Sequence, residues 1–295
     1  MEGTPTDAYA GLPGRGPGGS EFRVHYRDWG GDSRPIVLLH GLASSCRIWD
    51  LSAPLIAGPF RVIAVDQRGH GLTDRPDSDY TLDEVCRDLA ALLDALGFEQ
   101  LLLVGHSWGA NVALQFAADY SERLRGLVLV DGGMTEISAS SSWEEAEKMM
   151  RPPDIDGVPV ERFLGFARNF PHMQGVWSPK IQEMLLSNFL IEDGKVYRRL
   201  TIENHMKVAR SIYGQKPGQI YSRVRCPVLL VPAFREPVGE QEMAWQRLRD
   251  EGIKKALEML PGARLRAMEN TPHDIPVFRP EHLASAIVEF ARSLD

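Results

Sequence analysis

Continuously apolar runs and amphipathic segments alternate along most of the chain. Four continuous runs occupy residues 35–41, 60–67, 100–107 and 124–133. Runs of this kind are typical of strands buried on both faces of a parallel sheet. The segment 22–29 alternates polar and apolar residues instead, which predicts an edge strand.

Helices are predicted between and after these strands. Residues 81–97 carry leucine and valine at helical spacing, with Thr81 placed to cap the start and Gly97 to end the helix. Another helix is expected directly after Ser107. Further strands (225–233, 263–270) and helices (239–260, 280–294) follow later in the chain. This alternation predicts an α/β fold in which helices cover a mostly parallel sheet.

Two segments depart from the alternation. Residues 134–224 contain amphipathic pieces separated by prolines and no convincing buried strand, which predicts a helical insertion. Residues 1–20 are rich in glycine and proline and have no apolar core, so we expect a mobile leader and not a signal peptide. The core is then expected to consist of residues 21–133 and 225–295.

Composition narrows the classes of function. The 295 residues are 43% hydrophobic and 25% charged, as in a soluble globular protein, and the net charge is −7. No basic stretch predicts binding to nucleic acid, and no apolar run is long enough to insert into a membrane. The three cysteines are widely spaced without metal-ligand spacing, and they favour a reducing, cytoplasmic location.

The sequence GHSWG, residues 105–109, places one serine between two glycines where an apolar run ends and a helix begins. A serine hydroxyl becomes a good nucleophile only beside a base, an orienting acid and donors for the oxyanion. A strained turn between strand and helix holds such a serine outward, and flanking glycines give the turn steric clearance. Ser107 is therefore the candidate nucleophile, the alternative being a capping serine at an ordinary turn.

Two backbone amides are candidates for the oxyanion hole. Gly41 follows an apolar run, and the next residue, Leu42, can present its N–H to the oxyanion. The second candidate donor is the N–H of Trp108, the residue after the nucleophile. We expect His40, beside this loop, to be structural.

The base must be a histidine, and His273 has the best context among the eight in the chain. It follows a predicted strand and precedes the terminal helix, whereas His282 lies within that helix. The other histidines are expected to have structural or surface roles: His25, His70, His106, His172 and His205. No metal or organic cofactor is required for this chemistry.

Together, several segments resemble the α/β-hydrolase superfamily over nearly the whole chain after the leader. They are His40-Gly41, DQRGHGLTDRP (66–76), GHSWG (105–109), LVLVDGG (127–133), CPVLLV (226–231) and His273. The resemblance implies the α/β-hydrolase fold, with a central sheet flanked by helices. It also implies that residues 134–224 form a helical cap inserted after strand 6, over the active site.

The acid of the triad has two candidates. Many relatives place an aspartate shortly after the strand that corresponds to 226–231, and here Glu236 falls at that position. Other relatives place the acid after the preceding core strand, where this chain has Asp131. A buried aspartate at a strand end needs a partner, which an imidazole N–H can supply. We expect Asp131 to be the acid, with Glu236 as the alternative.

Trp108 raises one competing interpretation. Epoxide hydrolases and dehalogenases often read G-x-D-W-G, in which an aspartate attacks the substrate and forms an alkyl ester. This chain shares the tryptophan but has Ser107 at the position of the aspartate. The serine argues against both activities, and we expect the Trp108 side chain to pack under the cap.

The residues and the resemblance predict a carboxylesterase-like serine hydrolase that forms an acyl-enzyme with a small, apolar ester. The same site would also serve a lactonase, an amidase or peptidase, a C–C bond hydrolase or a perhydrolase. A ligand receptor without catalytic activity is the alternative from another functional class.

Overall fold

An eight-stranded sheet forms the centre of the computed structural model, which describes residues 3–31 and 33–294. The strands lie in the order β1-β2-β4-β3-β5-β6-β10-β12. Their bounds are β1 Thr6–Leu12, β2 Phe22–Asp28, β3 Pro35–Leu39, β4 Arg61–Val65, β5 Leu101–His106, β6 Leu124–Val130, β10 Val228–Val231 and β12 Arg264–Leu265. From β4 to β12 neighbouring strands are parallel, whereas β1 and β2 are antiparallel to their neighbours. The predicted α/β-hydrolase fold, with its mostly parallel sheet, is confirmed.

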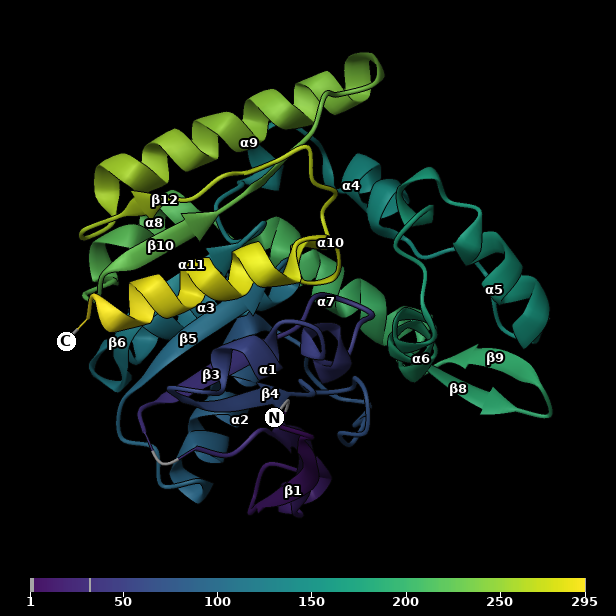
Figure 1. Cartoon of the computed structure of the whole chain (residues 1–295), viewed down its shortest axis with the longest axis horizontal. Coiled ribbons are helices and arrows are strands. Elements are labelled where there is room, and N and C mark those ends of the chain that lie inside the picture. The colour runs from purple at the N-terminus through teal and green to yellow at the C-terminus, as the bar shows by residue number, and fades with distance from the viewer. Residues whose placement is uncertain (1–2, 32, 295) are drawn as a thin grey trace.

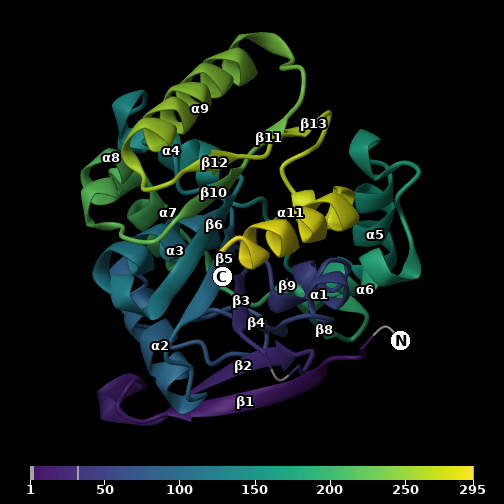
Figure 2. The same ribbon diagram turned by 60° about the vertical axis from the view of Figure 1, so that its left-hand side comes forward.

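The central strands are buried on both faces, as their continuous apolar character predicts. In β5, Leu101 and Leu103 belong to one hydrophobic core, and Leu102 and Val104 belong to the other. Successive side chains of a strand point to opposite faces, so each core receives every second residue. Figure 2 shows α2 and α3 on one side of the sheet and α1 and α11 on the other.

The helices of the core include those predicted from periodicity. Their bounds are α1 Ala53–Ile56, α2 Leu82–Ala95, α3 Trp108–Asp119, α9 Gly239–Met259, α10 Ile275–Phe278 and α11 Pro280–Arg292. Short 3₁₀ helices cover Pro17–Gly19, Cys46–Trp49, Ser121–Arg123, Ile137–Ala139, Pro171–Met173 and Tyr221–Arg223. The Thr81 side chain accepts a hydrogen bond from Glu84 N at 3.3 Å, and Gly97 has a φ of 69°. Thr81 therefore caps the start of α2 and Gly97 follows its end, as the sequence predicts.

Residues 134–224 follow β6 and contribute no strand to the central sheet among the residues described. Their helices are α4 Trp143–Met150, α5 Val160–Arg168, α6 Pro179–Ser187, α7 Ile202–Gly214 and α8 Pro217–Ile220. Figure 1 shows α4, α5 and α6 grouped to one side of the sheet. Arg47 forms an ion pair with Glu183 at 2.6 Å, which links the core to α6.

The insertion predicted to be helical at 134–224 also contains a small sheet. The amphipathic pattern that starts at residue 178 continues to residue 191, but α6 ends at Ser187 and Phe189–Glu192 forms β8. This strand pairs with β9 (Lys195–Arg198), which also pairs with β7 (Val158–Pro159). The hairpin turn is Asp193-Gly194, and both residues have positive φ, at 48° and 70°. A two-residue Asp-Gly turn with positive φ favours a hairpin over a continuing helix.

The expected mobile leader is wrong for Thr6–Leu12, which forms β1. This strand pairs with β2 along its whole length and supplies hydrogen bonds to the side of β2 that faces away from β4. Leu12 is buried, and Arg15 forms ion pairs with Glu84 and Asp88 of α2, both at 2.7 Å. The prediction of an edge strand at 22–29 is also wrong, because β1 occupies the edge.

The region 263–270 forms two short strands rather than one. The first is β12, and the second, β13 (Met268–Glu269), pairs in parallel with β11 (Ala233–Phe234) outside the main sheet. This second pairing carries the chain to the loop that holds His273. Among the described residues, no helix is both long and apolar enough to cross a membrane.

Candidate active site

The loops at the carboxyl ends of the parallel strands bring the candidate residues together at that end of the sheet. Leu42 follows β3, Ser107 follows β5 directly, and Asp131 follows β6 directly. His273 follows β13, which lies beside the end of β10. Open α/β sheets bind ligands in the crevice outside the carboxyl ends of their strands, where adjacent loops diverge.

Ser107 occupies a strained turn between β5 and α3. Its φ is 54° and its ψ is −121°, a conformation that residues with a side chain rarely adopt. A Cβ on Gly105 would lie 2.2 Å from Gly109 O, and a Cβ on Gly109 would lie 2.6 Å from Leu39 O. The two glycines are therefore needed for the close packing of this turn against its neighbouring strands.

Asp131 and His273 form a hydrogen-bonded pair. His273 Nδ1 lies 2.6 Å from Asp131 Oδ2, and Asp131 Oδ1 accepts a hydrogen bond from Ala233 N at 2.9 Å. Asp131 is buried, whereas 54% of the His273 side chain is exposed. The alternative acid, Glu236, is exposed and lies outside the set of described residues that line the site. The structure thus brings Asp131, and not Glu236, into contact with His273.

The pair perturbs the protonation of both partners. Desolvation lowers the pKa of His273, but the hydrogen bond and negative charge of Asp131 outweigh it, so the pKa is raised above 6.5. Burial opposes the ionisation of Asp131, but the hydrogen bond and charge of His273 dominate and lower its pKa. Asp131 is therefore a carboxylate at neutral pH and favours the imidazolium form of His273.

A cavity of about 620 Å³ connects these residues. Leu42, Ser107, Trp108 and His273 all line it. Met149 and Met150 of α4 also line it, so part of its wall comes from the segment 134–224. Ser107 Oγ has no hydrogen bond to His273 among the described residues, and hydrogen bonds of this type often tighten only when substrate binds.

Two backbone amides are candidates to bind an oxyanion beside Ser107. A Cβ on Gly41 would lie 3.4 Å from Ser107 Oγ, so the loop that carries Leu42 approaches the hydroxyl closely. Trp108 is the first residue of α3, and the first amides of a helix have no acceptor within it. The Trp108 side chain is buried and lies against the ring of His70, with centroids 5.0 Å apart. The described ring contacts of Trp108 are with His70 and His40 of the core, so packing under the cap stays a prediction. Its amide remains available to a ligand.

His106 connects the serine turn to the loop that holds His273, a role that the sequence did not suggest. Its Nε2 donates a hydrogen bond to the carbonyl oxygen of His273 at 3.1 Å, and the two rings lie 5.0 Å apart. Burial and the neighbouring His273 lower the pKa of His106 to about 4, so the ring is neutral at pH 7. The adjacency of His106 to Ser107 was visible in the sequence, but its partner, 167 positions away, was not.

His106→Leu is expected to lower the kcat for an ester about tenfold with a smaller change in KM, because the His273 backbone loses a donor. His106→Gln, which keeps an N–H donor, should recover part of the loss, and His282→Leu on α11 is the surface control. Steady-state kinetics on the three variants would test this. Equal rates for His106→Leu and the wild-type protein would contradict a positioning role for His106.

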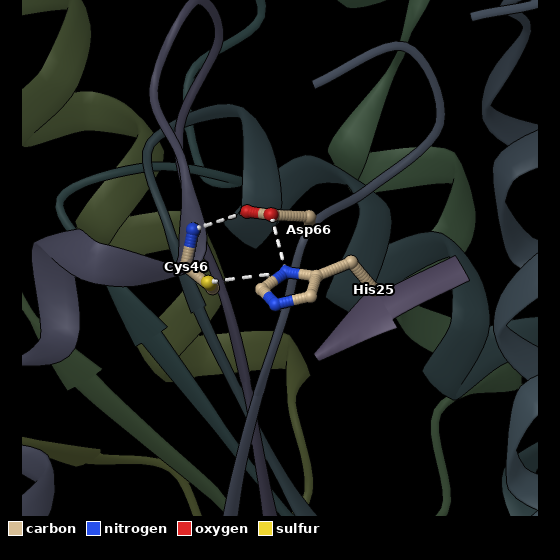
Figure 3. A group of neighbouring side chains, drawn as sticks. All are labelled: His25, Cys46 and Asp66. Carbon is tan, nitrogen blue, oxygen red and sulfur yellow. Dashed lines mark hydrogen bonds and ion pairs between the residues drawn. The ribbon is translucent and has the colours of Figure 1, made fainter. Parts of the chain in front are cut away.

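A second buried cluster consists of His25, Cys46 and Asp66 (Figure 3). Their ligand atoms lie within 4.8 Å of one another, as do those of His106, His273 and Asp274, so either group has the spacing to hold a metal. The carboxylate of Asp66, however, already accepts hydrogen bonds from His25 Nδ1 at 2.7 Å and from Cys46 N at 2.6 Å. Burial, with the charge of Asp66, raises the pKa of the Cys46 thiol well above its usual value, which disfavours the thiolate ligand.

Asp66 therefore has a structural role near the active site. It also accepts a hydrogen bond from Leu72 N at 2.9 Å. Burial opposes its ionisation, but the hydrogen bonds from His25 and Cys46 N, with the charges of His25 and His40, lower its pKa to about 2. Through Cys46 N, Asp66 anchors the end of the loop that begins at Gly41 and carries Leu42. The loop is fixed further at Ala43, whose N–H donates to His70 Nε2 at 3.1 Å.

Among the described residues, none of the other histidines forms a hydrogen bond with the Ser107 hydroxyl. His40 Nδ1 lies 2.7 Å from Gly41 O, so His40 is structural as expected. His205 lines the cavity, but its Nε2 donates to Met150 O at 3.0 Å and links α7 to α4. His172 stacks on Phe170, with ring centroids 5.6 Å apart.

Comparisons with known proteins agree with the fold. The family model for the alpha/beta hydrolase fold matches residues 34–168. The solved structure of E-2-(acetamidomethylene)succinate hydrolase superposes with a TM-score of 0.75 and 21% identity, covering 97% of this chain and 100% of that one. This similarity supports the fold alone.

The proteins with similar sequences are named for different enzymatic activities. Epoxide hydrolase 1 of Caenorhabditis elegans is 35% identical over 134 residues, which are 43% of this chain and 33% of that protein. A Bacillus subtilis (strain 168) protein, provisionally named 2-succinyl-6-hydroxy-2,4-cyclohexadiene-1-carboxylate synthase, is 27% identical over 89% of this chain and 92% of its own length. The chain thus spans about a third of the first relative and nearly all of the second.

Proposed function

Because the chain has the α/β-hydrolase fold and residues 34–168 match the model of that family, we propose that it is a serine hydrolase that cleaves carboxylic esters through an acyl-enzyme. The observation that carries the proposal is the arrangement of Ser107, His273 and Asp131 around one cavity. Ser107 is held at a positive φ beside Gly41, and the 2.6 Å contact with Asp131 orients His273. This arrangement supports acyl transfer because it supplies a nucleophile, a base and an orienting acid.

In the first half of the proposed reaction, neutral His273 removes the proton of the Ser107 hydroxyl as the oxygen attacks the ester carbonyl. The N–H groups of Leu42 and Trp108 stabilise the negative charge on the carbonyl oxygen. Asp131 stabilises the imidazolium that forms on His273. The intermediate collapses, the alcohol leaves with the proton from His273, and the acyl group stays on Ser107.

In the second half, His273 removes a proton from water, and the resulting hydroxide attacks the acyl carbonyl. The same two amides hold the second oxyanion. Collapse of this intermediate breaks the bond to Ser107 Oγ, which takes the proton back from His273. The acid product is released and the enzyme returns to its starting state.

Opening of epoxides is not proposed, despite the similarity to the nematode epoxide hydrolase. Attack by Ser107 on an sp³ carbon would form an ether, which has no carbonyl for hydroxide to attack. The site would be blocked by the first molecule that reacts. Lactones, amides and C–C bonds beside a carbonyl remain alternative substrates, since each presents an acyl carbon to the same serine.

A fluorophosphonate probe tests the proposal directly. The probe should label Ser107 in the folded protein, and 4-nitrophenyl butyrate should be hydrolysed with an initial burst if deacylation is slow. Labelling is read by mass spectrometry of the Ser107 peptide. Folded protein that is neither labelled nor active would refute the serine hydrolase proposal and favour a receptor.

The dependence of kcat/KM on pH gives a second test. His273 must be neutral to act as a base, so activity should rise with pH through the pKa of His273, with a midpoint above 6.5 because Asp131 raises that pKa. In Asp131→Asn the midpoint should move to lower pH, since the negative charge is lost. A wild-type midpoint below 6.5 would show that Asp131 does not stabilise the imidazolium.

A further inference from the structure

One wall of the cavity carries two arginines that the proposed reaction does not use. Arg235 follows β11 and Arg249 lies on α9, and both line the cavity together with Ser107. Among the described residues of its lining, Asp131 is the only carboxylate, and it is already paired with His273. The lining therefore contains two positively charged guanidinium groups and a single carboxylate among its described residues.

Arg249 is held rigidly and is incompletely paired. Its side chain is 14% exposed, its guanidinium lies 4.6 Å from the centroid of the Phe234 ring, and Nη1 donates to Ala233 O. Its Nε is buried without a hydrogen-bond partner among the described residues, and Asp250 Oδ1 lies 4.0 Å from it. Nη1 lies 4.0 Å from Asp131 Oδ1. Both carboxylates lie beyond hydrogen-bond distance of the guanidinium, and Asp131 already accepts from Ala233 N and pairs with His273. A desolvated guanidinium with free donor capacity is a strong site for a carboxylate.

Arg235 is more exposed than Arg249. Its side chain is 58% exposed and forms an ion pair with Glu242 at 2.7 Å. An exposed ion pair of this kind contributes little, so Arg235 can leave Glu242 for a ligand at low cost. Glu242 keeps a second partner, Val238 N, at 2.8 Å, and it does not belong to the described lining of the cavity.

The rest of the lining limits the ligand to one with an apolar part and an acidic part. Trp245 lies four residues before Arg249 on α9 and lines the cavity beside it. Other lining side chains are apolar, among them Met134, Ile137 and Ile212. A substrate that fills the cavity thus meets apolar surface as well as the two guanidinium groups.

We propose that the substrate is an ester that carries a free carboxylate, bound by Arg249 and Arg235 while Ser107 attacks the ester carbonyl. This inference rests on the proposed serine hydrolase function and specifies its substrate class. Arg249 supplies the fixed, desolvated part of the carboxylate site, and Arg235 closes on it from the rim.

Two matched pairs of substrates test the proposal. In the first, 4-nitrophenyl glutarate is compared with its 4-carbamoylbutyrate analogue, so the charge lies in the acyl part. In the second, 4-carboxyphenyl butyrate is compared with 4-carbamoylphenyl butyrate, so the charge lies in the alcohol. The carboxylate should be preferred in kcat/KM about tenfold or more in one pair, the factor that one charge-assisted hydrogen bond supplies. Absence of a preference in both pairs would overturn the proposal.

Variants of α9 then assign the preference to the cavity wall. Arg249→Gln should reduce the ratio between carboxylate and carboxamide substrates to near one, and Arg235→Gln should reduce it partly. Arg247→Gln is the matched control, because it removes the same charge from the exposed surface of the same helix outside the described lining. An unchanged ratio in Arg249→Gln, with lower rates on both substrates, would overturn the proposal and leave Arg249 as a support for Asp131.

A binding measurement separates failure of this proposal from failure of the proposed function. Calorimetric titration of the protein with glutarate and with glutaramide requires no turnover. Tighter binding of glutarate, lost in Arg249→Gln and kept in Arg247→Gln, would support the carboxylate site even if Ser107 were neither labelled nor active. Labelling of Ser107 with equal binding of glutarate and glutaramide would refute the carboxylate site alone.

Discussion

Replacement of Ser107 by alanine is expected to reduce ester turnover by roughly 10⁴-fold or more, to a rate near that of the residual, triad-independent reaction. The proposed acyl-enzyme is formed on Ser107 Oγ, and no other hydroxyl occupies the strained turn at the end of β5. Alanine keeps the Cβ and fits the same backbone, so the protein should remain folded. The measurement is kcat for 4-nitrophenyl butyrate, with the fold checked by circular dichroism.

The matched control for this variant is Ser285→Ala. Ser285 is an exposed serine on α11 whose hydroxyl bonds to Glu289 at 2.8 Å, so its loss should leave turnover unchanged. Turnover by Ser107→Ala within about tenfold of the wild-type rate would contradict covalent catalysis by Ser107. Any remaining activity would then belong to a water-based reaction or to a contaminant.

Asp131→Asn is expected to lower kcat by about 10³- to 10⁴-fold, whereas Glu236→Gln should have little effect. Asparagine fits the space of Asp131, but it has no charge to stabilise the imidazolium of His273. Its amide can also donate to Nδ1, which would favour the wrong tautomer of the ring. The comparison is informative because both substitutions remove one negative charge at nearly constant shape.

The two variants distinguish the candidate acids without relying on an absolute rate. A large loss in Glu236→Gln, with near wild-type activity in Asp131→Asn, would contradict the assignment of Asp131. The pH profile gives an independent readout, since only loss of the true acid should lower the pKa that governs the acidic limb. Thermal unfolding of both variants should accompany the kinetics, because Asp131 is buried and also holds Ala233 N.

Much of the fold could be predicted because its signals are local. The continuous apolar runs at β3 to β6 reflect burial on two faces, and the spacing within α2 reflects burial on one. The turns at Gly97 and around Ser107 were also predictable, because the residue types at those positions signal a turn locally. The same kind of signal was present at Asp193-Gly194, where the apolar helix-like spacing of the preceding residues concealed a hairpin.

The strand β1 shows what local patterns miss. Its sequence, TDAYAGL, has few large apolar residues, and most of its side chains are exposed. The strand is held by backbone pairing with β2 and by contacts of Leu12 and Arg15 with the core. Backbone hydrogen bonds leave little trace in the side-chain pattern, so composition alone suggested a mobile leader.

The sequence by itself determined where the candidate catalytic residues lie along the chain: Ser107 in a turn between strand and helix, and His273 in a late loop, each recognisable from its neighbours. Only the tertiary structure decided between Asp131 and Glu236 as partners of His273, since the contact joins residues 142 positions apart. The same holds for the bond from His106 to the His273 backbone and for Arg249 in the cavity wall. Such contacts depend on how loops from separate strands and helices meet at the carboxyl ends of the strands. The hydrophobic periodicity of a single segment contains no information about that meeting.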